Sequence, residues 1–136
     1  MNGSEDFFDT NVVLYLLSAD TAKADRAEDL LALGGTISVQ VLNEFVAVAS
    51  RKLRMSLMEI REVLTQIRAV CAVEPITVET HERALRIADR YGMSIYDALI
   101  VSAALLAGCE TLHSEDMQDG QVIDRKLTIR NPFAAA

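Results

Sequence analysis

Short apolar runs alternate with helical segments along almost the whole chain, and this alternation limits the possible folds more than any other feature of the sequence. The expected strands are short apolar or β-branched runs: 7–8, 36–38, 70–73, 111–114 and 127–129. The expected helices carry apolar residues at helical spacing: 12–17, 22–33, 41–52, 56–69, 79–91 and 95–107. This order predicts a three-layer α/β/α fold with a mostly parallel central sheet.

Length and composition fit a single domain. The chain has 136 residues, of which 51% are hydrophobic, so we expect residues 1–136 to share one core. Cys71 and Cys109 form no CxxC pair and are interpreted as small core residues in a reducing, cytoplasmic setting. The acidic N-terminus lacks the pattern of a signal peptide, and the apolar segment 98–107 is shorter than the roughly 20 residues of a membrane span. We therefore expect a cytoplasmic protein without a membrane segment.

The net charge of −7 weighs against nucleic-acid binding, because domains that bind nucleic acid usually carry a basic patch. Four cation-binding acids would explain part of this charge, since −7 + 4 leaves −3. Two basic segments could contact RNA or an acidic partner, although a solvated surface is the simpler interpretation of both. They are the run Arg51, Lys52 and Arg54, and the helix face Arg83, Arg86 and Arg90.

Four acids occupy positions where ligands gather in parallel sheets. Asp9 ends the first expected strand, and Asp116 lies just past the fourth. Glu44 belongs to the helix after the second strand, and Asp97 to the first turn of the apolar helix 95–107. Because ligands bind beyond the carboxyl ends of such strands, all four acids can meet at one edge of the sheet.

Each acid also has a simpler structural explanation, except Glu44. Asp9 and Asp97 can cap helices, and Asp116 can serve a turn. Glu44 lies within the apolar stretch 41–46, where an acid on a mostly buried helix needs a partner. The sequence places no obvious cation beside Glu44 or Asp97, so a metal ion shared among carboxylates is the simplest partner.

Oxygen ligands select hard cations, so the expected ion is Mg²⁺ or Mn²⁺ rather than zinc. Zinc would require His or Cys ligands nearby, and neither histidine has suitable spacing. His81 is interpreted as a surface residue and His113 as a strand residue.

Four motifs supply these acids in order along the chain: Phe8-Asp9-Thr10-Asn11-Val12 and residues 38–45, 94–100 and 114–120. Together they resemble the motifs of PIN-domain nucleases, and among these the VapC-type toxins of bacterial toxin–antitoxin pairs. The resemblance covers almost the whole chain. It implies a parallel sheet between helices, with the metal-binding acids Asp9, Glu44, Asp97 and Asp116.

The same resemblance implies supporting residues. Ser114 looks like the hydroxyl residue beside the last acid, where it would orient a carboxylate or a water molecule, and Asn11 would do similar work. Asp116 occupies the most variable acidic position of the family. Asp119 lies close enough in sequence to support it or to exchange roles with it.

The implied activity is hydrolysis of RNA with the help of Mg²⁺ or Mn²⁺. Water would attack phosphorus in line, which leaves a 5′-phosphate and a 3′-hydroxyl. Toxins of this family also resemble one another in forming homodimers and in being blocked by a small antitoxin protein whose tail enters the acidic groove. We therefore expect RNA, a cognate antitoxin and a second copy of the chain as partners.

Parts of the sequence are also compatible with two other functions. A phosphotransfer domain could phosphorylate an aspartate at the end of its first strand, but the phosphatase type needs an acid where this chain has Asn11. Receiver domains need an acid pair and a lysine that are not evident here. A PIN-like module that binds RNA or protein without cutting it stays open, and a cleavage assay separates it from an enzyme.

Overall fold

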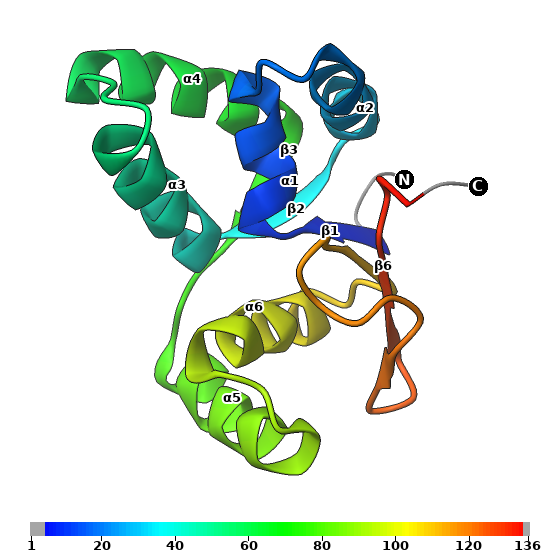
Figure 1. The fold of residues 1–136 in the computed structure, drawn as a ribbon. Helices are drawn as coiled ribbons and strands as arrows, with labels where there is room; N and C mark the ends of the chain where they lie inside the picture. Colours follow the sequence, from blue (N-terminus) through cyan, green and yellow to red (C-terminus); the bar gives the residue numbers. More distant parts are fainter. Residues whose placement is uncertain (1–4, 135–136) are drawn as a thin grey trace.

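The computed structural model describes residues 5–134 (Figure 1). Residues 1–4, which belong to the N-terminal segment discussed above, and the last two residues of the terminal Ala134–Ala136 run lie outside the described part. The strands are β1 (Asp6–Phe8), β2 (Gly35–Ser38), β3 (Cys71–Glu74), β4 (Thr111–His113), β5 (Val122–Ile123) and β6 (Leu127–Arg130). The helices are α1 (Thr10–Leu14), the 3₁₀ helix η2 (Tyr15–Leu17), α2 (Thr21–Ala32), α3 (Val39–Arg51), α4 (Leu57–Val70), α5 (Val78–Tyr91) and α6 (Ile95–Leu106).

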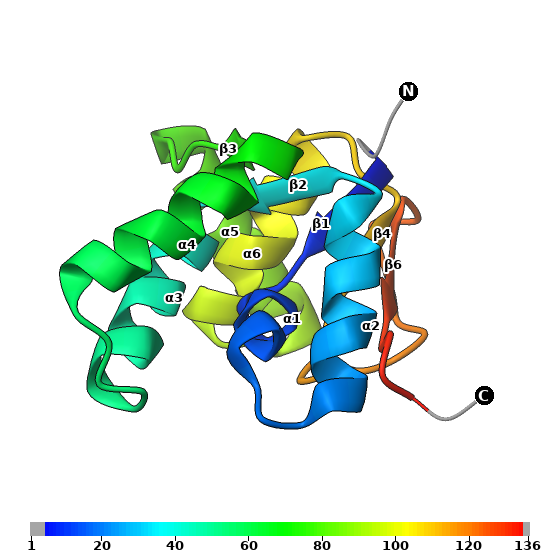
Figure 2. The ribbon, with the colours of Figure 1, turned by 90° about the horizontal axis from the view of Figure 1, so that it is seen from above.

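The six strands form one sheet in the order β3-β2-β1-β4-β6-β5. All neighbours pair in parallel except β5 and β6, which are antiparallel. Helices α1 to α4 lie on one side of the sheet, and α5 and α6 lie on the other (Figures 1 and 2). The predicted α/β fold with a mostly parallel central sheet is confirmed.

The strand order reverses between β1 and β4. The chain runs outward from β1 through β2 to β3, and then returns to place β4 on the other side of β1. The carboxyl ends of β1 and β4 therefore lie side by side, with α1 and the loop after β4 leading away from them. This is the position at which open α/β sheets form their ligand sites.

The core is formed by the sheet and the apolar faces of the helices. Phe7, Phe8, Ile37 and Leu112 from the strands are at most 1% exposed. Helix α6 buries residues on several sides, as its uniformly apolar sequence predicts. None of the helices within residues 5–134 has the length and apolar character needed to cross a membrane. Cys71 and Cys109 are buried, as predicted.

Gly35 lets β2 approach β1 closely. A Cβ atom at this position would lie 2.5 Å from Cε2 of Phe8 and 3.0 Å from the carbonyl oxygen of Asp6. Real Cβ atoms do not approach other atoms so closely, so a larger residue would displace β1. Since β1 leads directly into Asp9, Gly35 helps to fix the position of that carboxylate.

Three details of the predicted elements were wrong. The first helix is α-helical only to Leu14 and then tightens into η2. The third strand begins at Cys71, because Val70 is the last residue of α4 and is 46% exposed. Strand β5 was not predicted, because it has only two residues and pairs with β6 through a turn without glycine or asparagine.

Candidate active site

Four carboxylates line one cavity of about 280 Å³ at the edge of the sheet where β1 and β4 end. They are Asp9, Glu44, Asp97 and Asp116. Asp9 follows β1, Asp116 follows β4, Glu44 lies in α3 after β2, and Asp97 lies in the first turn of α6. The structure thus brings together all four acids that the sequence singled out, and no lysine or arginine of the described residues 5–134 lines the cavity with them.

Asp9 is the most buried of the four acids, with 4% of its surface exposed. Its Oδ1 accepts a hydrogen bond from the backbone N–H of Thr10 at 2.7 Å, so Asp9 also caps α1. Its Oδ2 accepts a hydrogen bond from Oγ of Ser114 at 2.7 Å and one from Nδ2 of Asn11 at 3.2 Å. Both residues that were expected to orient a carboxylate therefore contact this one.

Burial and mutual repulsion raise the pKa of two of the four cavity acids. Burial raises the pKa of Asp9 to about 6, although the hydrogen bonds from Ser114 and Thr10 act in the opposite direction. The negative charges of Asp97 and Glu44 raise this pKa further. The pKa of Asp97 is also raised, first by burial and then by Glu44 and Asp116. A cation in the cavity would relieve both effects.

Glu44 has neutral partners within the chain. Oγ1 of Thr10 donates a hydrogen bond to its Oε1 at 2.5 Å, and Nε2 of Gln40 donates one to its Oε2 at 2.8 Å. Glu44 therefore has hydrogen-bond partners that the sequence did not reveal, and its role as a metal ligand stays a prediction. Thr10 is far from Glu44 in sequence and could not be identified without the fold. These donors fix the carboxylate but do not neutralise its charge.

Asp97 and Asp116 keep their carboxylates available. At the start of α6, Oγ of Ser94 accepts a hydrogen bond from the backbone N–H of Asp97 at 3.1 Å, so the cap uses the serine side chain. Within residues 5–134, neither carboxylate accepts a hydrogen bond from the protein. Both can therefore contribute oxygen atoms to a ligand in the cavity.

Asp119 lies outside the cavity. It is exposed, and its Oδ1 accepts a hydrogen bond from the backbone N–H of Asn131 at 2.8 Å. This contact joins the loop after β4 to the segment after β6. The structure therefore gives Asp119 a place in the loop rather than among the cavity acids.

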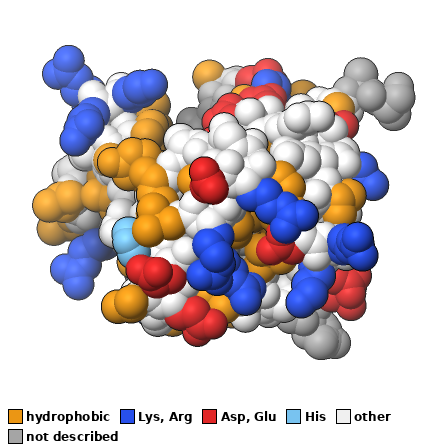
Figure 3. Space-filling model, turned by 90° about the horizontal axis from the view of Figure 1, so that it is seen from below, with side chains coloured by type: hydrophobic (Ala, Val, Ile, Leu, Met, Phe, Trp, Pro, Cys, Tyr) orange, Lys and Arg blue, Asp and Glu red, His pale blue; other side chains and the backbone are white. Residues whose placement is uncertain are grey.

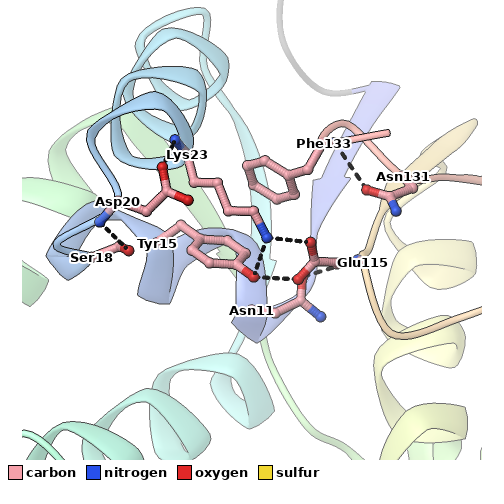
Figure 4. A network of polar contacts seen from close by, with 8 residues as sticks. All are labelled: Asn11, Tyr15, Ser18, Asp20, Lys23, Glu115, Asn131 and Phe133. Atoms are coloured by element: carbon pink, nitrogen blue, oxygen red, sulfur yellow. Dashed lines mark hydrogen bonds and ion pairs between the residues drawn. The ribbon is translucent and has the colours of Figure 1, made fainter. Parts of the chain in front are cut away.

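A polar network that the sequence did not reveal holds the loop after β4 (Figure 4). The carboxylate of Glu115 accepts a hydrogen bond from Tyr15 and forms an ion pair with Nζ of Lys23 at 2.9 Å. Nζ of Lys23 also donates to the Tyr15 hydroxyl at 3.1 Å, and the ring of Phe133 packs edge-on against Tyr15. The hydrogen bonds from Tyr15 and Lys23 hold the pKa of Glu115 below its usual value.

This network acts on the residues that flank Glu115. Its backbone N–H donates to Oδ1 of Asn11 at 3.1 Å, and Nδ2 of the same amide contacts Asp9. Ser114 and Asp116 are its neighbours in the chain: Ser114 donates a hydrogen bond to Asp9, and Asp116 lines the cavity. The partners of Glu115 come from α2 and η2, about 100 residues earlier, so no local sequence pattern could have indicated them.

The donor set fits a hard divalent cation. All four side chains offer carboxylate oxygens, which Mg²⁺ and Mn²⁺ prefer. In the part of the chain that the structure describes, no three His, Cys, Asp or Glu residues already stand close enough together to hold an ion. His113 lies in β4, where it contacts Asp6 at 3.1 Å, and His81 is exposed on α5, so neither joins the acids.

Comparison with known proteins gives a family and a set of structural neighbours. Residues 7–119 match the family model of the PIN domain. No curated protein matches the chain.

Among solved structures, a toxin–antitoxin complex from Klebsiella pneumoniae shares 21% sequence identity, covers 96% of this chain and 99% of the other, and has a TM-score of 0.72. VapC20 of Mycobacterium tuberculosis, described as a sarcin-ricin loop cleaving toxin, shares 23% identity over 82% of this chain and 89% of its own, with a TM-score of 0.66. VapBC2 from Rickettsia felis, bound to a promoter DNA fragment, shares 18% sequence identity. The match covers 93% of this chain and 97% of the other, also with a TM-score of 0.66. These structures share the fold.

Proposed function

Since the chain belongs to the PIN-domain family, we propose that it is a divalent-metal-dependent endoribonuclease and the toxin of a bacterial toxin–antitoxin pair. The PIN-domain family is a nuclease family. The observation that carries the proposal is the convergence of four carboxylates from four segments in one cavity, where the described part of the chain places no lysine or arginine. A catalytically silent module would have no need to keep such a repulsive cluster.

PIN nucleases generally use divalent metal ions. In this chain Asp9, Glu44, Asp97 and Asp116 would hold the ion, and their oxygen ligands favour Mg²⁺ or Mn²⁺. When bound, such an ion activates water for attack on phosphorus and offsets the charge of the phosphate oxygens.

The chain's own residues orient the carboxylates before any ligand arrives. Ser114 and Asn11 hold Oδ2 of Asp9, while Thr10 and Gln40 hold both oxygens of Glu44. These fixed contacts reduce the reorganisation that ligand binding requires. Asp97 and Asp116 carry no such contacts, so they are the carboxylates that adjust to the ligand.

RNA is the proposed substrate. The acid-lined cavity adjoins a second cavity of about 330 Å³ that shares four of its lining residues and reaches Lys52. Together the two cavities can hold more of the RNA than the scissile phosphate, and Lys52 supplies a positive charge in the second cavity. VapC20, which has the same fold, is described as a sarcin-ricin loop cleaving toxin.

A protein antitoxin and a second copy of the chain are the proposed partners. The neighbour from Klebsiella pneumoniae is described as a toxin–antitoxin complex. We place the protein in the cytoplasm, where an RNA substrate and an antitoxin would both be found.

Metal removal tests the mechanism. With total RNA as the substrate, we expect cleavage in the presence of Mg²⁺ or Mn²⁺. Cleavage should be lost in EDTA and should return when excess metal is added back. Mapping the cut ends should give 5′-phosphates. Full activity in EDTA would contradict the metal mechanism, and RNA binding without cleavage at any metal concentration would favour the silent module.

The network around Glu115 gives a second prediction. Lys23→Met removes the ion pair but keeps most of the apolar stem, so the loop that carries Ser114 and Asp116 should loosen. Partners that orient metal ligands typically change metal affinity 10- to 100-fold. We expect the Mg²⁺ concentration for half-maximal cleavage to rise by about 10-fold, with little change in the maximal rate.

A Mg²⁺ titration of cleavage measures this effect. Arg61→Met is the matched control, because Arg61 is an exposed cation on α4 away from the loop. A Lys23→Met enzyme with the wild-type Mg²⁺ dependence would show that the network does not position the site.

A further inference from the structure

A groove rich in cations lies apart from the acid-lined cavity. It is formed by two adjoining cavities that share Leu105 and Lys126 as lining residues. Six of the chain's 13 lysines and arginines line it: Arg83, Arg86, Arg90, Arg125, Lys126 and Arg130. Its acidic lining residues are Glu110 and Asp124. No residue lines both this groove and the acid-lined cavity, and we call it the α5–turn groove.

One wall of the α5–turn groove is a face of α5. Arg83, Arg86 and Arg90 are spaced by three and four residues, so they share one side of the helix. At 1.5 Å per residue, they follow one another at about 4.5 Å and about 6 Å along the axis. Figure 3 views the molecule from the side of α5 and shows several Lys and Arg side chains gathered on this face.

The other wall is the turn between β5 and β6, which adopts an unfavourable backbone conformation. Asp124 and Arg125 have φ angles of 52° and 60°, a region that glycine or asparagine normally occupies in such turns. The Tyr91 hydroxyl at the end of α5 fixes the turn, because it accepts from the backbone N–H of Asp124 at 2.9 Å and donates to Oδ1 of Asp124 at 3.1 Å. The turn thereby holds Lys126 beside the α5 arginines, while Arg125 lines the adjoining cavity.

Among the described residues, the cations of the groove form no ion pair with an acid. In residues 5–134, the ion pairs within 4.0 Å are Lys23 with Glu115 and His113 with Asp6. None of the six groove cations takes part, although the chain has 20 acidic residues that could pair with them. Gathering like charges without counter-ions is unfavourable, so this arrangement suits a ligand that brings negative charge.

We propose that the α5–turn groove binds the phosphate backbone of the RNA substrate at a site remote from the cleaved bond. This inference rests on the proposed function, since RNA is the substrate there. A chain of net charge −7 with an acidic cavity repels a polyanion, so a separate cationic surface is needed to hold it. Arginine suits this task, because its planar guanidinium donates two parallel hydrogen bonds to phosphate oxygens.

The proposal is tested by RNA binding without turnover. In the Asp9→Asn background with EDTA present, binding of a structured RNA is measured by fluorescence anisotropy between 50 and 200 mM KCl. Arg86→Gln combined with Arg125→Gln removes one cation from each wall. We expect affinity to fall about 10-fold at 100 mM salt, and the slope of log K against log salt to flatten by about 1.5, as for two lost phosphate contacts.

Arg61→Gln combined with Arg68→Gln is the matched control, because both are exposed arginines on α4 outside the groove. Tyr91→Phe keeps every cation but releases the turn, so it should weaken binding less than the double substitution. Circular dichroism checks that the variants are folded.

Affinity and salt slope equal to those of the α4 control would overturn the proposal. If the groove variant instead binds RNA normally but loses binding to poly-glutamate, the groove accepts an acidic protein segment. The binding assay does not depend on cleavage. A wild-type chain that cuts no RNA would therefore contradict the proposed function, while RNA binding by the α5–turn groove would still be decided by the binding assay.

Discussion

Asp9→Asn is expected to lower the rate of RNA cleavage by about 10³-fold or more. Asp9 lies at the end of β1, where Ser114, Asn11 and the backbone of Thr10 hold its carboxylate toward the other acids. An amide of the same size fills the space but offers only one oxygen and no charge. Losing about 4 kcal/mol of transition-state stabilisation at a metal-dependent site corresponds to this factor.

Initial rates of cleavage in saturating Mg²⁺ measure the effect. Asp25→Asn serves as the control, because it makes the same chemical change at an exposed position on α2. Circular dichroism and thermal unfolding confirm that both variants are folded. An Asp9→Asn rate within 10-fold of the wild type would remove Asp9 from the catalytic site and weaken the whole assignment of the cavity.

The fold was predictable because each element carries its own local signal. The helix that became α6 is almost entirely apolar after its first turn, which predicts burial, and Gly92 and Gly108 end α5 and α6 with φ angles of 69° and 77°. Strand β5 carried no such signal. It exists because the turn at Asp124 and Arg125 is held by Tyr91, which is a tertiary contact.

The four acids were predictable because each lies shortly after a strand, in the helix that follows a strand, or in the first turn of a buried helix. The rule that ligands gather beyond parallel strands then brought them together. Their partners were harder to find from sequence. Thr10 reaches Glu44 across 34 residues, and Lys23 reaches Glu115 across 92. Side-chain hydrogen bonds between distant segments leave no periodic pattern, so reasoning from residue spacing could find the ligands but not what fixes them.

Asp9 should also make the protein less stable as the pH rises, and this is the second large effect. Burial raises the pKa of its carboxyl group from 3.8 to about 6 in the folded state. Between these values the unfolded chain has lost the proton while the folded chain keeps it. Stability is therefore fully present below about pH 3.8 and is lost as the pH rises through about 6, by about 3 kcal/mol in total.

Urea unfolding without divalent cations at pH 4.5 and 7.5 measures this loss. About 2 of the 3 kcal/mol should be lost between pH 4.5 and pH 7.5. Over this range the free energy of unfolding of the wild type should therefore drop by about 2 kcal/mol more than that of Asp9→Asn, whose amide cannot ionise. The comparison is needed because other acids titrate in the same window, including Asp97, whose pKa is also raised.

Mg²⁺ at about 100 times its Kd should restore about 2.7 kcal/mol to the wild type at pH 7.5. It should restore clearly less to the variant, because the variant lacks one ligand. The two results together would explain why a chain keeps a destabilising buried acid: the ion that the acid binds offsets the cost of ionising it. Equal pH dependence in the two proteins would instead show that Asp9 is already neutralised or solvated in the folded state, and that its burial does not prepare it for a cation.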